Sequence, residues 1–238
     1  MARPVLLLTR PRQASLDFAA SLGEGVAAEV VIAPLIAIEP VGEVPDLDGF
    51  AGVIVTSGHA VARLGEALRG RRVFTVGERT AEAAAAFGAT ARCLGATVDA
   101  FIDRLGEVAT PAIYLHGRHV STDLARVAQS RRSDVTARVI YDQVPRPLEE
   151  DALRAARGGR TVVAPVFSRR SADLLTRALA GDASPPLFVA ISDAVADRLR
   201  AHGEVVVAET PDAGAMRRAV LEVIGAAGLA GGPDALRL

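Results

Sequence analysis

The chain has 238 residues, of which half are hydrophobic and 23% are charged, and its formal net charge is −1 at pH 7. A near-neutral balance of this kind does not mark the chain as a binder of nucleic acids or membrane surfaces. All 27 basic residues are arginines, so catalysis through a lysine Schiff base and phosphate binding by a Walker-type lysine are excluded.

Cysteine content and the lengths of the hydrophobic runs narrow the class of protein further. Cys93 is the single cysteine, which excludes an internal disulfide framework and a cysteine-ligated metal site. The first apolar run, Val5–Leu8, is too short for the core of a signal peptide, and no run approaches the roughly 20 residues of a membrane helix. We therefore expect a soluble, cytoplasmic protein with no membrane or nucleic-acid partner. No extended apolar surface stripe is evident, which favours a monomer.

Short β-branched runs alternate with Ala- and Leu-rich amphipathic segments along the chain. This alternation predicts α/β architecture, with parallel sheets covered by helices on both faces. Strands are expected at Val5–Thr9, Glu29–Ala33, Val53–Thr56, Val73–Val76, Ile113–Leu115, Thr161–Ala164, Leu187–Ile191 and Val205–Ala208. Helices are expected at Gln13–Leu22 and near residues 59–69, 79–87, 121–129, 170–180, 193–202 and 212–226.

The order of elements repeats within the chain. A strand followed by Ser57 leads into a helix, and the next strand is followed by a small-residue turn at Gly77 and a second helix. The same order recurs at Ser168 and Ser192. Any two α/β segments share part of this plan, but the matching positions of Ser57 and Ser168 favour an internal duplication.

Two extended segments with flanking prolines, Leu35–Pro40 and Arg138–Val144, have a different character. If they run side by side, the fold consists of two similar parallel-sheet α/β lobes joined by a two-strand β-ladder hinge. The first lobe would be discontinuous, with residues 1–36 and 145–226, and the second lobe would be inserted as residues 41–138. Residues 37–40 and 139–144 would form the hinge strands, and residues 227–238 would form a flexible tail.

Hydroxyl side chains stand where several expected strands end and helices begin. These residues are Ser57, Thr80, Ser168 and Ser192. In this position a hydroxyl commonly caps the helix N-terminus. The free N–H groups of the same turn also attract anions. Because ligands of parallel sheets bind at the carboxyl ends of the strands, several such turns around one cleft would suit a ligand with several carboxylates.

Arginine and histidine residues follow two further strand ends. Arg10 could hold a carboxylate with two hydrogen bonds, or it could simply lie on the surface. The strand expected at Ile113–Leu115 is followed at its carboxyl end by His116, Arg118 and His119. The two histidines have no obvious carboxylate or third imidazole nearby, so solvated or anion-facing roles are favoured over a metal site.

Tyr141 is one of two tyrosines and lies in the second extended segment. Its phenol could donate a proton to a leaving hydroxide. A tyrosine in a β-ribbon is also what β-propensity alone would place there. No dinucleotide-binding, nucleophile-elbow, kinase or P-loop motif is present in the chain.

At these residues the chain resembles the uroporphyrinogen-III synthase family. The resemblance covers about residues 3–226 and depends on the order of several weak motifs. The motifs are Leu8–Pro11, Pro34–Pro40, Val55–Val61, Val76–Ala81, Val139–Tyr141, Phe167–Ser168, Ala190–Ser192 and Glu209–Pro211.

The resemblance implies two α/β lobes joined by a two-strand ladder and a lyase of heme biosynthesis. The implied enzyme removes water from hydroxymethylbilane and closes it to uroporphyrinogen III, with the last pyrrole ring inverted through a spiro intermediate. It needs no metal or organic cofactor. A transient contact with the upstream deaminase, which makes the unstable bilane, is a further implied possibility.

The resemblance also implies roles for individual residues. Tyr141 matches the tyrosine that is usually proposed to assist departure of the substrate hydroxyl. The residues that match hydroxyl-bearing positions of the family's cleft are Ser57, Thr80 and Ser168. The full set of expected substrate-binding residues is Arg10, Ser57, His59, Thr80, Arg118, Ser168 and Ser192. The chain departs from the family at His59, where Asn is frequent, at His116, where Arg is frequent, and at Val195, where Thr is usual.

Two other interpretations of the sequence remain open. The chain could be a non-catalytic, two-lobed binder of a small polyanion, although it lacks an export signal. It could also be a regulatory or scaffolding relative that kept the fold and lost the chemistry. Formation of the type III porphyrinogen isomer separates the enzyme from both.

Overall fold

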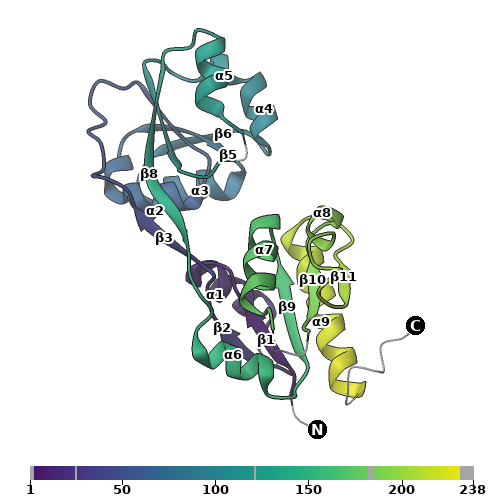
Figure 1. Cartoon of the computed structure of the whole chain (residues 1–238). Coiled ribbons are helices and arrows are strands. Elements are labelled where there is room, and N and C mark those ends of the chain that lie inside the picture. Colours follow the sequence, from purple (N-terminus) through teal and green to yellow (C-terminus); the bar gives the residue numbers. More distant parts are fainter. Residues whose placement is uncertain (1–2, 25, 121, 182–184, 231–238) are drawn as a thin grey trace. The chain divides into compact units, whose positions relative to one another are not determined.

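The computed structural model describes residues 3–24, 26–120, 122–181 and 185–230, with side chains described up to residue 227. The chain divides into two compact units (Figure 1). Unit 1 contains Met1–Ala37 and Pro145–Leu238, and unit 2 contains Ile38–Val144. In the described part of the chain, no helix combines the length and the apolar character needed to cross a membrane.

Unit 1 is built on a five-stranded sheet in which all paired strands are parallel. The strand order is β11 (Val205–Val207), β10 (Leu187–Ala190), β9 (Val162–Val166), β1 (Val5–Leu8) and β2 (Glu29–Ile32). The three central strands are buried along their whole length, as their continuous apolar sequences predict for a sheet covered on both faces.

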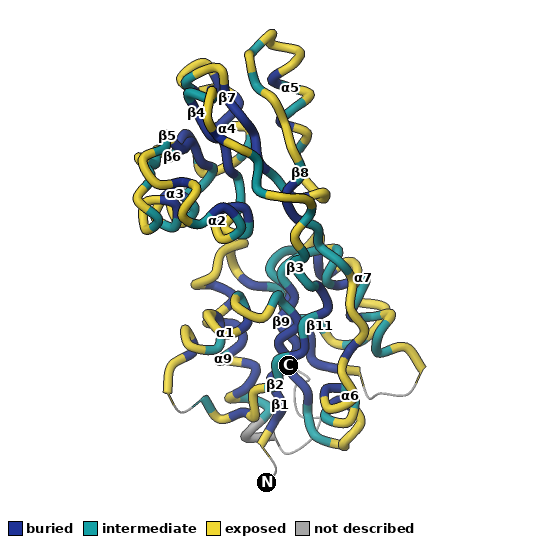
Figure 2. The backbone as a smooth tube through the Cα atoms, turned by 90° about the vertical axis from the view of Figure 1, so that its left-hand side faces the viewer, coloured by how far each residue is buried: buried dark blue, intermediate teal, exposed yellow. Residues whose placement is uncertain are grey.

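Helices cover both faces of the unit 1 sheet. Alternate residues of β1 point to opposite faces, so Val5 and Leu7 join one core cluster while Leu6 and Leu8 join the other. The first cluster contains residues of α6 (Glu150–Arg157), α7 (Arg169–Ala178) and α8 (Asp193–Ala196). The second contains residues of α1 (Arg12–Ser21) and α9 (Ala213–Ala230). Figure 2 colours the backbone by burial, with buried residues along the central strands and exposed residues along the helices.

A second sheet of six strands forms the framework of unit 2. Its order is β3 (Ile36–Pro40), β8 (Val135–Pro145), β7 (Ala112–Gly117), β4 (Gly52–Val55), β5 (Arg72–Val76) and β6 (Thr90–Gly95). The pairs from β8 to β6 are parallel. The two extended segments of the sequence are neighbours in this sheet, where Val41 N donates to the carbonyl oxygen of Ile140 at 3.0 Å.

Helices again pack on both faces of this sheet. One core cluster contains residues of α2 (Gly58–Leu64), the 3₁₀ helix η1 (Gly65–Leu68) and α3 (Glu78–Ala86). The other contains residues of α4 (Val98–Asp103), the 3₁₀ helix η2 (Leu105–Glu107) and α5 (Leu124–Ser130). The two parallel-sheet α/β units confirm the fold class expected from the sequence.

The two sheets share one strand order, which supports the internal duplication. In unit 2 the order from β8 to β6 places β7 beside β4, and in unit 1 the order from β2 to β11 places β1 beside β9. The central strands β4 and β9 correspond to each other. On one side of them lie β5 and β6 in unit 2 and β10 and β11 in unit 1. On the other side lie β7 and β8 in unit 2 and β1 and β2 in unit 1. Unit 1 therefore has the topology of unit 2 in circularly permuted form.

Several element boundaries differ from the sequence expectations. The helix expected near 59–69 changes to 3₁₀ geometry at Gly65, where φ is 50°, a value that strains residues with a side chain. The helix expected near 193–202 is regular over Asp193–Ala196 and continues as turns with i→i−3 bonds such as Leu199 N to Ala196 O. Strand β6 and helices α4 and α6 were not expected.

The C-terminal segment differs in part from the expected flexible tail. Helix α9 continues to Ala230, so the backbone of residues 227–230 is helical. The rest of the expected tail, residues 231–238, lies outside the described residues.

Candidate functional site

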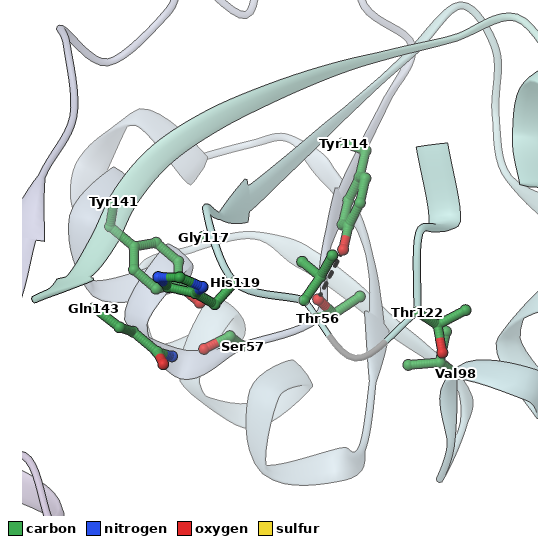
Figure 3. Close-up of a pocket in the computed structure, with 10 residues that line it drawn as sticks. Thr56, Ser57, Val98, Tyr114, Gly117, His119, Thr122, Tyr141 and Gln143 are labelled. Carbon is green, nitrogen blue, oxygen red and sulfur yellow. Dashed lines mark hydrogen bonds between the residues drawn. The ribbon is translucent and has the colours of Figure 1, made fainter. Parts of the chain in front are cut away.

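The strand order of unit 2 places a topological switch point between β4 and β7. Chain connections leave these two neighbouring strands in opposite directions, and ligands of open parallel sheets bind at the carboxyl ends of such strands. A pocket of about 200 Å³ lies at this point (Figure 3). It is lined by Thr56, Ser57, Val98, Tyr114, Gly117, His119, Val120, Thr122, Tyr141 and Gln143.

Ser57 follows β4 and begins α2. Its backbone is extended, with φ −149° and ψ 139°, and its hydroxyl oxygen accepts a hydrogen bond from the backbone N–H of His59 at 3.2 Å. Ser57 is therefore a helix N-cap and a pocket residue at once. The first turn of α2 adds backbone donors at the same strand end.

Tyr141 lies on β8 opposite Gly117, at a bulge where the register with β7 shifts. A Cβ atom on Gly117 would come within 2.5 Å of the Tyr141 ring and 2.8 Å of its hydroxyl. Glycine at 117 is what allows the ring to lie against the backbone of β7. The ring is 4% exposed and meets His59 edge to face at 5.8 Å. Within the described residues the hydroxyl of Tyr141 has no hydrogen-bond partner, and the side chain lines the pocket.

The second tyrosine, Tyr114, lines the same pocket and was not expected to do so. Its hydroxyl lies 3.3 Å from Oγ1 of Thr56, at the end of β4. Burial raises the pKa of the Tyr114 phenol above its ordinary value, and the hydrogen bond with Thr56 offsets part of that effect. The Tyr114 ring is 2% exposed and stacks on His116 at 4.5 Å. An alternation signal was present in the sequence, because Tyr114 and His116 share one face of β7.

Asp142 lies on β8 between two residues that line the pocket, Tyr141 and Gln143. Its carboxylate accepts hydrogen bonds from Nε of Arg118 at 2.8 Å and from the backbone N–H of Gln143 at 2.7 Å, and it lies 3.5 Å from Nε2 of His119. Desolvation raises the pKa of Asp142, but the two hydrogen bonds and the nearby positive charge outweigh it, so the pKa lies below its ordinary value. Asp142 was not among the expected site residues.

Unit 1 has its own switch point, between β9 and β1. Arg10 follows β1, and its guanidinium carbon lies 4.2 Å above the centre of the Phe167 ring, which follows β9. Ser168 caps α7 by accepting from Ser171 N at 3.1 Å, and its hydroxyl also meets the Ser171 hydroxyl at 2.8 Å. Ser192 begins α8 without a side-chain capping bond.

The expected site residues thus fall into two groups. Ser57, His59, Thr80, Arg118 and Tyr141 belong to unit 2, and Arg10, Ser168 and Ser192 belong to unit 1. Of the first group, Ser57 and Tyr141 line the pocket, and His59 contacts Tyr141. Arg118 does not line the pocket and is bonded to Asp142, the residue after Tyr141.

Thr80 does not take the capping position that its place in the sequence suggested. Helix α3 begins at Glu78, with Gly77 at the N-cap in a positive-φ conformation of 75°. Thr80 therefore lies in the first turn of α3, where its backbone N–H donates to the Gly77 carbonyl oxygen at 3.1 Å.

The histidines of the β7 loop have local partners. Nδ1 of His116 lies 2.9 Å from the carbonyl oxygen of Gly117, and His119 faces Asp142. In the part of the chain that the structure describes, no group of three or more His, Cys, Asp or Glu residues is arranged to hold a metal ion.

Comparisons with known proteins identify the family. The family model described as uroporphyrinogen-III synthase HemD matches residues 17–218. A sequence comparison with curated proteins finds no significant match.

Two solved structures have a similar fold. The crystal structure of uroporphyrinogen-III synthetase from Helicobacter pylori matches with a TM-score of 0.66 and 15% identity, over 93% of this chain and all of that one. A mutant uroporphyrinogen III synthase from Thermus thermophilus matches with a TM-score of 0.51 and 18% identity, over 96% of this chain and 99% of that one. At these identities the likeness describes the fold, whereas the family model matches most of the sequence. The chain therefore belongs to the uroporphyrinogen-III synthase family, whose members are cyclising lyases of heme biosynthesis.

Proposed function

We propose that this chain converts hydroxymethylbilane to uroporphyrinogen III with loss of one water molecule. The family match over residues 17–218 carries the proposal. The pocket at the switch point of unit 2 supports it, because this pocket combines a phenol, a serine hydroxyl and the first turn of a helix at the carboxyl ends of adjacent strands.

Tyr141 is the proposed general acid. Tyr141 lines the pocket, and its hydroxyl has no hydrogen-bond partner within the described residues. A substrate hydroxyl in the pocket would therefore meet a donor whose proton is not already engaged. The C–O bond of the hydroxymethyl group breaks, the phenol proton leaves with the hydroxide as water, and the terminal pyrrole becomes an azafulvenium cation. The packing of the ring on Gly117 fixes where the phenol lies.

The other site residues are proposed to bind the substrate carboxylates. Ser57 and Thr80 lie in the first turns or caps of α2 and α3, and Ser168 and Ser192 begin α7 and α8. Helix N-termini carry partial positive charge and free N–H groups. Three cationic or ionisable side chains, Arg10, His59 and Arg118, complete the proposed set.

This arrangement addresses an entropic problem. The linear substrate carries eight carboxylates and many rotatable bonds, and the reaction requires its two ends to meet in one orientation. Donors that hold several carboxylates remove that freedom before the bond forms. The departure at Val195 does not change the proposal, because this residue of α8 is 3% exposed and packs in a core cluster of unit 1.

The cellular setting completes the proposal. We place the enzyme in the cytoplasm as a monomer, with hydroxymethylbilane delivered by transient contact with the upstream deaminase. Sedimentation of the purified protein tests the monomer, and cross-linking with the deaminase during turnover tests the contact.

The decisive experiment generates hydroxymethylbilane in situ, adds the protein, oxidises the products and separates the porphyrin isomers. We expect isomer III. Isomer I alone, which forms without enzyme, would reject the proposed function and leave the non-catalytic polyanion binder as the better interpretation.

A further inference from the structure

Asp142 is an acidic residue at the edge of a pocket that we assign to an anionic substrate. The negative charge of Asp142 should repel the substrate carboxylates. We therefore ask what other role this carboxylate has. Its carboxylate is 23% exposed at the side chain, and it meets Arg118 at 2.8 Å and His119 at 3.5 Å. Asp142 therefore holds two potentially cationic residues that follow each other on one loop.

The loop after β7 has little other support for these side chains. Arg118 and His119 are 56% and 49% exposed at the side chain and lie outside regular structure. The backbone N–H of Arg118 donates to the Tyr141 carbonyl oxygen at 3.0 Å, which ties the loop to β8. Without the Asp142 carboxylate, the long Arg118 side chain would sample many rotamers, and binding would have to restrict it again.

The Asp142 carboxylate is itself held by the backbone of its own strand. The backbone N–H of Gln143 donates to its second oxygen at 2.7 Å, and the pKa of Asp142 is lowered from its ordinary value. The carboxylate therefore stays ionised at neutral pH and keeps one orientation. One strand thus places Tyr141, Asp142 and Gln143 in succession, with the first and third lining the pocket directly.

We propose that Asp142 is a positioning residue that presents Arg118 and His119 to a carboxylate of the bound substrate at the mouth of the Tyr141 pocket. The guanidinium N–H groups of Arg118 other than Nε–H have no partner within the described residues, and His119 lines the pocket. A guanidinium held at Nε can still present its other N–H groups to a carboxylate. The inference names a carboxylate subsite within the proposed function and therefore rests on it.

Substitution of Asp142 by Asn distinguishes positioning from plain electrostatics. The variant keeps the shape of the side chain and removes one negative charge. If Asp142 only opposed the substrate, the variant would bind anions more tightly. If it positions Arg118 and His119, we expect the KM for hydroxymethylbilane to rise about five- to tenfold while kcat changes by less than about twofold.

Binding is measured separately, with uroporphyrin III as a stable probe that carries the same eight carboxylates. We expect its Kd to rise by the same factor in Asp142→Asn. Asp142→Glu, which retains the charge, should recover part of the affinity. The matched control is Asp48→Asn, which breaks an exposed Asp–Arg pair with Arg71 elsewhere in unit 2 and should change neither KM nor Kd.

A double-mutant cycle measures whether Asp142 acts through Arg118 and His119. In a background of Arg118→Ala and His119→Ala, the further change Asp142→Asn should alter Kd by less than about twofold, because the positioned groups are already gone. An unchanged or lowered Kd for Asp142→Asn overturns the inference, as does wild-type protein that fails to bind the porphyrin. If Asp142→Asn does not fold, the single variants Arg118→Ala and His119→Ala take its place, since both side chains are exposed. Each of these two variants must then raise the Kd for uroporphyrin III. Wild-type protein that binds the porphyrin but forms no isomer III rejects the proposed function alone.

Discussion

The contact between Tyr141 and Gly117 joins the proposed proton donor to the backbone of a neighbouring strand. Because the tyrosine hydroxyl has no partner within the described residues, the change Tyr141→Phe removes a proton donor without leaving a buried group unpaired. The bilane loses its hydroxyl even without enzyme. The rate enhancement supplied by the acid should therefore lie at or below the lower end of the range that is usual for general acid–base catalysis. We expect kcat for isomer III to fall about ten- to hundredfold, with thermal unfolding unchanged.

The second tyrosine provides a comparison for this experiment. Tyr114 has similar burial, but its hydroxyl is already bonded to Thr56. Tyr114→Phe should therefore lower kcat much less than Tyr141→Phe and should lower stability more, because it leaves Thr56 without that partner. Equal rates for wild type and Tyr141→Phe would remove Tyr141 from the mechanism.

Gly117 is the second residue whose role is testable by itself. An added methyl group would clash with the Tyr141 ring, with its nearest carbon atoms 2.5 Å away. The ring must shift in Gly117→Ala, and overpacking of this kind costs about 1–3 kcal/mol of unfolding free energy. We expect both the chemical denaturation midpoint and the yield of isomer III to fall. Gly106→Ala is the control, because an added Cβ there meets nothing within 4 Å, and a similar loss in that variant would contradict the explanation.

At the scale of the element, the serines at the N-termini of α7 and α8 allow helix capping to be distinguished from substrate binding. Ser168 accepts a hydrogen bond from Ser171 N at 3.1 Å, whereas Ser192 makes no capping bond. Ser168→Ala should lower the unfolding free energy by about 1 kcal/mol, and Ser192→Ala should lower it by only a few tenths. Urea denaturation measures both values. A change in KM for either variant beyond its effect on stability would assign the hydroxyl to substrate binding, and equal destabilisation would contradict the capping assignment.

The elements predicted from the sequence are those with continuous apolar or strongly periodic patterns. Strands β1, β4 and β9 are buried on both faces, and that burial leaves a direct mark on their composition. Strand β6 lies at the edge of its sheet and has one buried residue, Leu94, among exposed and half-buried ones. Helix α4 spans only six residues, so neither element gives a clear signal in one sequence.

The site was only partly predictable for a different reason. Ser57 and Tyr141 could be named from their places in the chain. By contrast, the roles of Tyr114, Gly117 and Asp142 depend on the pairing of β7 with β4 and β8 and on the register shift at Gly117. Pairing between distant strands and a one-residue bulge leave little trace in local sequence.

At the scale of the whole molecule, each core cluster that the described residues form belongs to a single unit. The two clusters of unit 2 draw all their buried residues from Leu47–Tyr141, and the two clusters of unit 1 draw theirs from outside that range. Neither unit therefore needs the other to complete a core.

A fragment of residues 38–144 should consequently fold alone. It retains both clusters of unit 2 and the strands from β4 to β7 intact. We expect one cooperative calorimetric transition with an enthalpy of about 60–80 kcal/mol, as is usual for a domain of about 100 residues. The same fragment carrying Val53→Asp, which places a charge in the core, should show no such transition. A broad, non-cooperative transition in the unmodified fragment would show that unit 2 depends on unit 1, despite the separation of their cores.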